Sequence, residues 1–170
     1  MKRMILLSLF CLAGVVMANA QRFALIDMEY IMENIPEYQQ ANNELELASQ
    51  QYQKAVEAKA KEAEALYLAY QKAANTLSAT QRTQKEEAIV AKEREAAELR
   101  KKYFGPEGEM AQKQEALIAP IQNRIYEAVK QISSQKGYDA VIDRASATSI
   151  IFASPRIDIS NEVLAKLGYS

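Results

Sequence analysis

The chain has no histidine, and its single cysteine, Cys11, lies close to the N-terminus. Histidine is the commonest general base, the usual zinc ligand and a member of most catalytic triads, so sites of these kinds are excluded. If the segment containing Cys11 is removed on export, the mature protein also lacks a thiol for a disulfide, a metal or a covalent intermediate. We therefore expect a protein that is not an enzyme and has no cofactor or metal, stabilised by packing alone.

Glycine and proline are also scarce, with five glycines and four prolines in 170 residues. Ala, Glu, Gln and Lys dominate the middle of the chain, and this composition favours long helices. The one local glycine cluster, residues 105–108, lacks the Lys-Ser/Thr pair that ends a phosphate-binding loop. The formal net charge of −1 gives no reason to expect nucleic acid as a partner.

The N-terminus predicts export. A basic start precedes an apolar run over residues 4–17, and the small residues Ala18 and Ala20 follow at the two positions that a signal peptidase reads. Residues 1–20 are therefore interpreted as a signal peptide, with Gln21 as the first residue of the mature chain. About 150 residues then remain, enough for one ordinary domain.

The N-terminal segment has two other interpretations. A transmembrane anchor needs about 20 apolar residues, and this run is shorter. A lipoprotein would be modified at Cys11, but the bulky Phe10 directly before it argues against lipidation.

Hydrophobic periodicity in the middle of the chain predicts a long helical hairpin, residues 36–136. From Glu37 to about Thr76 the sequence has no glycine or proline, and apolar residues recur every three or four positions. Residues 77–80 break the pattern with Ser78 and Thr80, which are good N-cap residues, so the hairpin tip is expected there. The return helix offers an alanine-rich seam to the outgoing one, which predicts coiled-coil-like packing.

Gly105, Pro106 and Gly108 interrupt the return path at residues 105–108. Proline lacks a backbone N–H and disfavours helical geometry in the residue before it, so a kink or a loop is expected. The alternative is that the true tip lies here, which would leave two helices of very unequal length. The helix ends read from sequence leave both interpretations open.

The two flanks of the hairpin, residues 21–35 and 137–170, predict a small discontinuous body. Short apolar runs rich in β-branched and bulky residues indicate strands at about 22–27, 139–143 and 149–153, the last two as a strand pair. A C-terminal helix is expected at about 160–167. The fold class is α+β and mainly α, with a long antiparallel hairpin that projects from the body.

Four tyrosines lie on the expected hairpin, and they have two interpretations. As large, mostly apolar side chains they fill the seam between the helices. As side chains with an adaptable polar end they suit weak contact with many partners. The residues are Tyr52, Tyr67, Tyr70 and Tyr103.

Taken in order, these segments resemble the Skp/OmpH family of periplasmic outer-membrane-protein chaperones. The resemblance covers nearly all of the chain after the signal peptide and is most specific in the last third. The segments that carry it are Phe23–Asp27, the glycine-free helix, Leu77-Ser78, Pro120–Ile132, Lys136–Asp143 and Asp158–Leu164.

The resemblance implies a homotrimer in the periplasm, in which strands of three chains form the body and three hairpins surround a cavity. It implies an ATP-independent holdase that binds unfolded outer-membrane proteins and prevents their aggregation during outer membrane protein assembly. Contact with lipopolysaccharide or a membrane surface is a weaker implication, because known members are strongly basic and this chain is slightly acidic. The core that the three bodies would bury contains Phe23, Leu25, Val141, Ile150 and Phe152.

A structural function is the alternative interpretation. In that case the protein is an envelope spacer or scaffold, and its coiled arms contact one fixed partner. The two functions predict different binding: a holdase binds unfolded chains, whereas a scaffold binds one folded partner.

Overall fold

The computed structural model describes residues 22–147 and 149–169, which form two compact units. We call residues 22–31 with 126–169 the body, and residues 32–125 the hairpin. The chain is mainly helical with one small sheet, so the predicted α+β, mainly α class is confirmed. The predicted cleavage residues Ala18, Ala20 and Gln21, and Cys11, lie outside the described residues.

The sheet of the body contains two strands, β1 (Phe23–Ile26) and β2 (Ala140–Asp143). They are parallel, with Phe23 opposite Ala140 and Ile26 opposite Asp143. The ladder is extended at one end by the Asp139 N–H, which donates to the Arg22 carbonyl at 2.7 Å. Three residues of β1 are buried in a row, which is typical of a strand covered on both faces.

The expected strand at 149–153 is wrong for the single chain. Residues 149–154 have no strand hydrogen bonding in the described part of the chain, and β2 pairs with β1 rather than with this segment. On its other side β1 accepts the Ile159 N–H at the Leu25 carbonyl, at 2.9 Å. Strand propensity is realised only where a hydrogen-bonding partner exists, and the positions beside β1 are already taken.

Short helices complete the body. They are α2 (Met28–Glu33), part of which belongs to the hairpin, η3 (Pro155–Ile157) and α6 (Ser160–Leu167). Val163 and Leu164 on α6 are buried, and the helix ends at Gly168 with φ = 91°, the left-handed conformation that glycine adopts at lowest cost.

The body is larger than the sequence suggested, because the end of α5 (Glu109–Lys136) belongs to it from Tyr126 onward. The apolar stripe of α5 continues through Ala128 and Ile132, which are 5% and 2% exposed. The second part of the body therefore begins at Tyr126, and not at Gly137 as the sequence analysis expects. Pro120 lies inside α5 without ending it.

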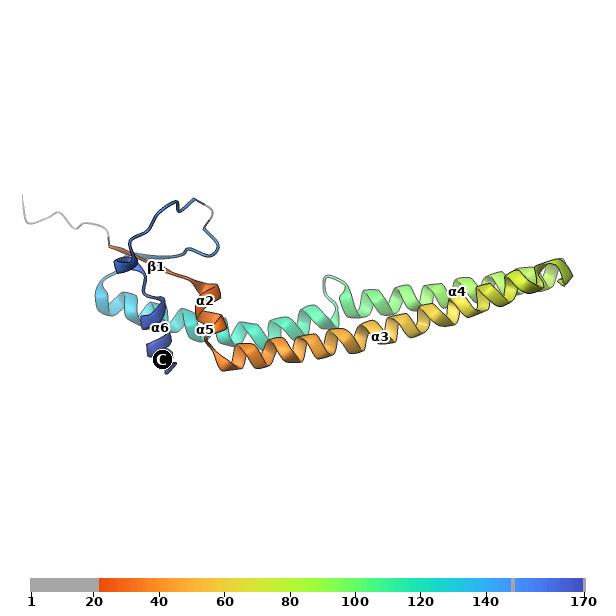
Figure 1. Cartoon of the computed structure of the whole chain (residues 1–170), viewed down its shortest axis with the longest axis horizontal. Helices are drawn as coiled ribbons and strands as arrows, with labels where there is room; N and C mark the ends of the chain where they lie inside the picture. The colour runs from red at the N-terminus through yellow and green to blue at the C-terminus, as the bar shows by residue number, and fades with distance from the viewer. Residues whose placement is uncertain (1–21, 148, 170) are drawn as a thin grey trace, which may run out of the picture. The chain divides into compact units, whose positions relative to one another are not determined.

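The hairpin is built from α3 (Pro36–Ala73), the short turn η2 (Ala74–Thr76), α4 (Ala79–Phe104) and the first half of α5. Figure 1 shows α4 running beside α3. With 38 residues, α3 is about 57 Å long at a rise of ~1.5 Å per residue. Ser78 caps α4 in a capping box, in which its hydroxyl accepts from the Gln81 N–H and the Gln81 side chain accepts from the Ser78 N–H.

The break at 105–108 is a loop and not the tip of the hairpin. Cross-helix contacts join α3 to α4 on one side of this loop and α3 to α5 on the other, through the ion pairs Lys59–Glu95 and Glu44–Lys113. The chain therefore reverses between α3 and α4 only, and α5 continues the return path. The Gly105 N–H donates to the Lys101 carbonyl at 2.8 Å, which closes the last turn of α4.

Candidate functional site

The carboxylates of the body hold its strand ends together. Arg144 pairs with Asp27 at 3.1 Å and with Asp158 at 3.3 Å, and the Ser160 hydroxyl accepts from the Asp27 N–H at 2.8 Å. Among residues 22–147 and 149–169, no group of three His, Cys, Asp or Glu side chains could hold a metal ion. The ion pairs and the hydrogen bond join the end of β1 to the start of α6, which is a structural role.

Asp143 at the end of β2 illustrates the same use of carboxylates. Partial burial by itself raises the pKa of this carboxyl, but hydrogen bonds outweigh it and the net pKa is lowered. The donors are the N–H groups of Met28 and Ala145 and the hydroxyl of Ser146. Asp143 is thus held as an ionised acceptor that ties β2 to the start of α2.

Two of the four candidate tyrosines fill the seam of the hairpin. Tyr52 on α3 and Tyr103 on α4 stack with ring centroids 4.1 Å apart and planes 7° apart. The Tyr52 hydroxyl donates to Glu109, and this hydrogen bond raises the pKa of Tyr52. Both residues are half-buried and their rings stack on each other, so they stabilise the region beside the loop.

The other two tyrosines differ from each other. Tyr70 is half-buried, and its hydroxyl donates to Glu86 on the facing helix, which raises the pKa of Tyr70. Tyr67 is 48% exposed, and its hydroxyl accepts from Gln71 at 2.8 Å. Of the four, Tyr67 presents the largest open ring face, so it is the best candidate for contact with a partner.

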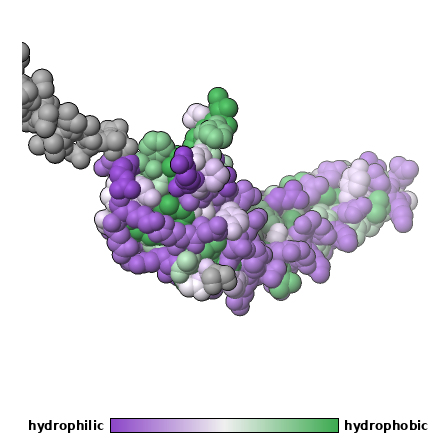
Figure 2. All heavy atoms as spheres, turned by 60° about the vertical axis from the view of Figure 1, so that its left-hand side comes forward, coloured by the Kyte–Doolittle hydropathy of each residue, from purple (hydrophilic) through white to green (hydrophobic). Residues whose placement is uncertain are grey.

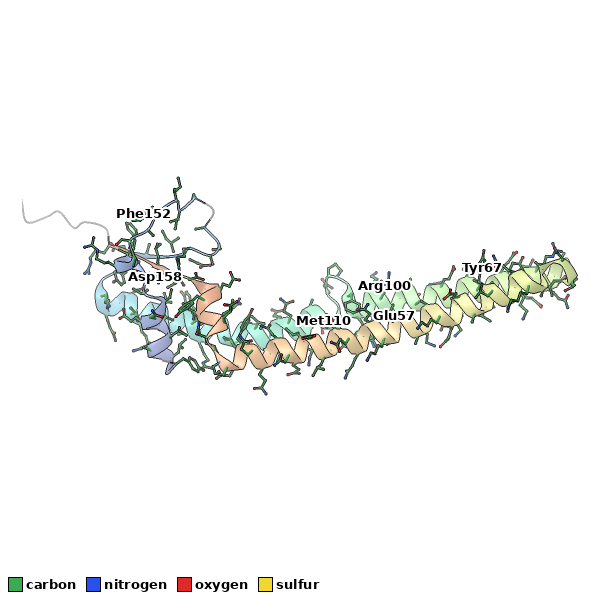
Figure 3. All side chains as sticks on the ribbon, in the orientation of Figure 1. Glu57, Tyr67, Arg100, Met110, Phe152 and Asp158 are labelled. Carbon is green, nitrogen blue, oxygen red and sulfur yellow. The ribbon has the colours of Figure 1, made fainter. Side chains whose placement is uncertain are left out.

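Tyr67 stands at the edge of a groove of about 670 Å³ between α3 and α4, which we call the arm groove. Figure 3 labels Tyr67 and Arg100, two of its lining residues, on the hairpin. Phe104, 43% exposed, also lines it. Four alanines, two from each helix, also line the groove, and we call them its floor: Ala60, Ala63, Ala96 and Ala97.

Paired charges hold the same two helices together. Lys59 and Glu62 on α3 face Lys92 and Glu95 on α4, with cross-helix distances of 3.8 Å for Lys59–Glu95 and 3.4 Å for Lys92–Glu62. Hydrogen bonds from Lys59 and Lys92 lower the pKa of Glu62, and the bond from Lys92 lowers that of Glu95. All four side chains are substantially exposed, so the cluster sets the register of the helices more than it adds stability.

The body has large apolar side chains that are exposed to solvent. Of the five residues expected in the core that three bodies would bury, only Leu25 is buried within one chain, at 2% exposed; Val141 and Ile150 are half-buried. Phe23 is 51% and Phe152 85% exposed in the single chain, and their burial between three bodies stays a prediction. Figure 2 shows hydrophobic surface on the body, and Phe152 lies in the connection between β2 and η3 (Figure 3).

Sequence reasoning missed the arm groove and the Arg144 cluster. A signal for the groove was present, because Val56, Ala60, Ala63 and Tyr67 follow one helical stripe, and Glu93, Ala97, Arg100 and Phe104 follow the facing one. This signal is ambiguous, because alanines along a helix stripe predict close packing of two helices as readily as a groove between them. The cluster had no local signal, since Asp27, Arg144 and Asp158 are far apart in the chain.

None of the helices within the described ranges has an apolar stretch long enough to span a bilayer.

The family model for OmpH-like outer membrane proteins matches residues 22–167. The chaperone protein Skp of Yersinia enterocolitica is 26% identical over 156 residues, which cover 92% of each chain. A crystal structure from Caulobacter crescentus CB15, described as an OmpH-like outer membrane chaperone, has the same fold, with a TM-score of 0.66 at 13% identity over 86% of this chain and 83% of the other. With nearly the whole described chain matched, this protein belongs to the OmpH-like outer membrane protein family.

Proposed function

We propose that this protein is an ATP-independent holdase of the periplasm that binds unfolded outer-membrane proteins and prevents their aggregation. A homotrimer would carry out this function, with clients held in a cavity between the helical hairpins of three copies. The observation that carries the proposal is the surface of the hairpin. Large apolar side chains are exposed at several points along its helices, namely Leu47, Tyr67, Leu68, Val90 and Phe104.

Small apolar contacts spread along two helices suit reversible holding. Each exposed side chain covers little area and contributes weakly, at roughly 25 cal/mol per Å² of apolar surface covered, so affinity comes from many contacts at once. An unfolded client can then exchange contacts without the energy of nucleotide hydrolysis. The name of the Yersinia relative, chaperone protein Skp, supports the same function.

The exposed apolar surface of the body supports self-association. Ile151 is fully exposed and Phe152 is 85% exposed, although both are large hydrophobic side chains. Such residues are normally covered, and a two-stranded sheet is too small to be stable without additional packing. Association of three bodies would bury Phe23 and Phe152 and could pair residues 149–153 with a neighbouring chain.

Aggregation of a denatured β-barrel outer-membrane protein tests the holdase. Diluted from urea without nucleotide, the client should remain soluble at a slight excess of trimer, as measured by light scattering. Aggregation at the rate seen without the protein would contradict the proposal. Saturable binding to one folded envelope protein, with indifference to unfolded clients, would favour the scaffold function instead.

Solution mass tests the trimer with a matched pair of variants. Phe152→Ser should shift the mass measured by sedimentation from three chains toward one, because it removes the most exposed phenylalanine of the body. Leu47→Ser removes an exposed apolar side chain from the hairpin instead and should leave the mass unchanged. A wild-type protein that sediments as a single chain would rule out the trimer.

A further inference from the structure

We propose that the arm groove binds a short extended segment of unfolded polypeptide, with apolar side chains between Tyr67 and Phe104 and an acidic group beside Arg100 and Lys101. The inference rests on the proposed function and adds a site within each hairpin, distinct from the cavity between copies. The site is complete in one chain, since every lining residue belongs to α3, α4 or the start of the adjoining loop.

The length of the groove fits a few residues of extended chain. Its lining positions on α3 run from Val56 to Tyr67, and those on α4 from Glu93 to Phe104. The two helices are antiparallel and Phe104 lies beside Tyr52, with ring centroids 6.4 Å apart, so the groove from Phe104 to Tyr67 spans about fifteen positions of α3, or ~22 Å at ~1.5 Å per residue. An extended chain advances ~3.3 Å per residue, so about seven residues occupy this length.

Small floor residues and large end residues give the groove its selectivity for side chains. Four alanines leave room between the two helices, whereas the rings of Tyr67 and Phe104 stand about half exposed. In an extended chain every second side chain points to the same face. A segment with alternating apolar and polar residues therefore places two or three apolar side chains on the alanine floor and its polar side chains in water.

The charges of the rim distinguish this groove from the rest of the hairpin seam. Lys59, Glu62, Lys92 and Glu95 pair with one another. By contrast, within the part of the chain that the structure describes, no ion pair involves Arg100, Lys101, Glu64 or Glu93, all of which line the groove. Two cations and two carboxylates thus remain available to a ligand.

These charges also give the groove a direction. Arg100 and Lys101 lie near Phe104, whereas Glu93 is about two helical turns away on α4 and Glu64 is on α3 near Tyr67. A ligand with an acidic residue at one end and a basic residue at the other complements this arrangement. Guanidinium groups bind carboxylates in a forked geometry, so Arg100 is the residue on which the acidic end depends most.

A labelled heptapeptide tests the site directly. It begins with lysine, ends with aspartate and has leucine, phenylalanine and leucine at its second, fourth and sixth positions, separated by serine. Binding to the purified full protein is measured by fluorescence anisotropy. A peptide of the same composition with the three apolar residues contiguous is the ligand control and should bind several-fold more weakly.

Two variants of the protein separate the floor from the charges. Ala97→Leu fills the floor and should weaken binding about tenfold, whereas Ala88→Leu makes the same change on α4 outside the groove and should have no effect. Arg100→Gln should weaken binding about tenfold for the aspartate peptide, and much less when asparagine replaces that aspartate. Lys85→Gln removes one positive charge elsewhere on α4 and should leave binding unchanged.

The outcomes distinguish the groove from the holdase function. Equal peptide binding by wild type, Ala97→Leu and Arg100→Gln would overturn the groove, even if all three suppress aggregation of a client. Peptide binding that these variants weaken, without any suppression of aggregation, would support the groove and remove the proposed function. A change of solution mass in Ala97→Leu alone would assign the groove to a second copy of the chain and would also overturn the proposal. Helix content by circular dichroism controls for misfolding, and Arg100→Gln, at an exposed position, tests the site independently of the floor.

Discussion

The body and the hairpin are stabilised by different side chains, although both contain helices. In the body the buried positions are occupied by large aliphatic residues, such as Ile31, Ile132 and Val163, each 2% exposed or less. Along α3 in the hairpin the buried positions are Ala41, Ala48, Val56 and Ala63. The hairpin also buries large aliphatic side chains, at Ile35, Ile89, Ile121 and Ile125, but the rest of the seam between α3 and α4 depends on helix propensity, close approach and paired charges. This difference leaves the larger side chains of the hairpin free for contact with other molecules.

The largest effect should come from removing aliphatic volume in the body. Ile132→Ala should lower the free energy of unfolding by about 2–5 kcal/mol, because it removes a 2% exposed side chain and leaves a cavity. The same change at Ile89, 7% exposed on α4, should cost less than about 2 kcal/mol, since two helices with an alanine seam can close the gap. Urea unfolding followed by circular dichroism measures both. Equal losses at the two positions would mean that the hairpin has a true core.

The loop at 105–108 should be the most sensitive point of the hairpin. A Cβ at Gly108 would lie 2.8 Å from the Tyr103 carbonyl oxygen and 2.9 Å from the Lys102 carbonyl oxygen, which are backbone atoms. Gly108→Ala should therefore cost about 1–3 kcal/mol in the free energy of unfolding through a forced backbone shift. Ala111→Gly, in the adjoining helix, makes the opposite exchange as a control and should cost about 1 kcal/mol or less. A Gly108→Ala protein as stable as wild type would show that the loop relaxes freely.

Ser160 tests a polar contribution to the body. It is 3% exposed, and its hydroxyl accepts from the Asp27 N–H at 2.8 Å. Ser160→Ala should cost about 1 kcal/mol, because this N–H loses its acceptor in a partly buried position. Ser134→Ala is the control, since the Ser134 hydroxyl only donates to the Lys130 carbonyl on an exposed helix surface. If both serines prove neutral, packing alone accounts for the stability of the body.

The smallest effect should come from the ion pairs of the hairpin and should depend on pH. Hydrogen bonds from Lys59 and Lys92 lower the pKa of Glu62 in the folded hairpin, so its contribution to stability is fully present above its unfolded pKa and is lost as the pH falls through the lowered value. Glu62→Gln should therefore reduce the melting temperature slightly at neutral pH and not at strongly acid pH. Thermal unfolding at several pH values checks this. Added salt should also reduce the difference in melting temperature between wild type and Glu62→Gln, because salt screens the ion pairs. If this difference persists in strong acid, the effect of the substitution comes from packing and not from charge.

Most of the helical architecture could be predicted because its signals are local. The absence of glycine and proline from Glu37 to Thr76 predicts one long helix, and α3 occupies nearly all of that range. Ser78 is a recognisable N-cap, and it begins α4. Gly105 and Pro106 predict a break in the helix, but whether this break is a loop or the hairpin tip depends on which helices pair.

Strand pairing could not be predicted in the same way. The run Ser149–Ala153 has the composition of a strand, and among residues 22–147 and 149–169 of the single chain it has no strand partner. Phe23 and Phe152 are expected to be covered by other copies of the chain, and in the single chain both are more than half exposed. The four tyrosines have similar surroundings in the sequence, and only their contacts distinguish Tyr67 from the stacked pair Tyr52 and Tyr103.

By itself, the sequence determined the long helices, their caps and the site of the break, because each helical hydrogen bond joins residues four positions apart. The tertiary structure alone decided that β1 pairs with β2, that α5 continues along α3 beyond the loop, and that small residues on two facing stripes form the arm groove. These features arise where residues distant in the chain meet, and no local pattern specifies which of several suitable partners a strand or a helix face receives.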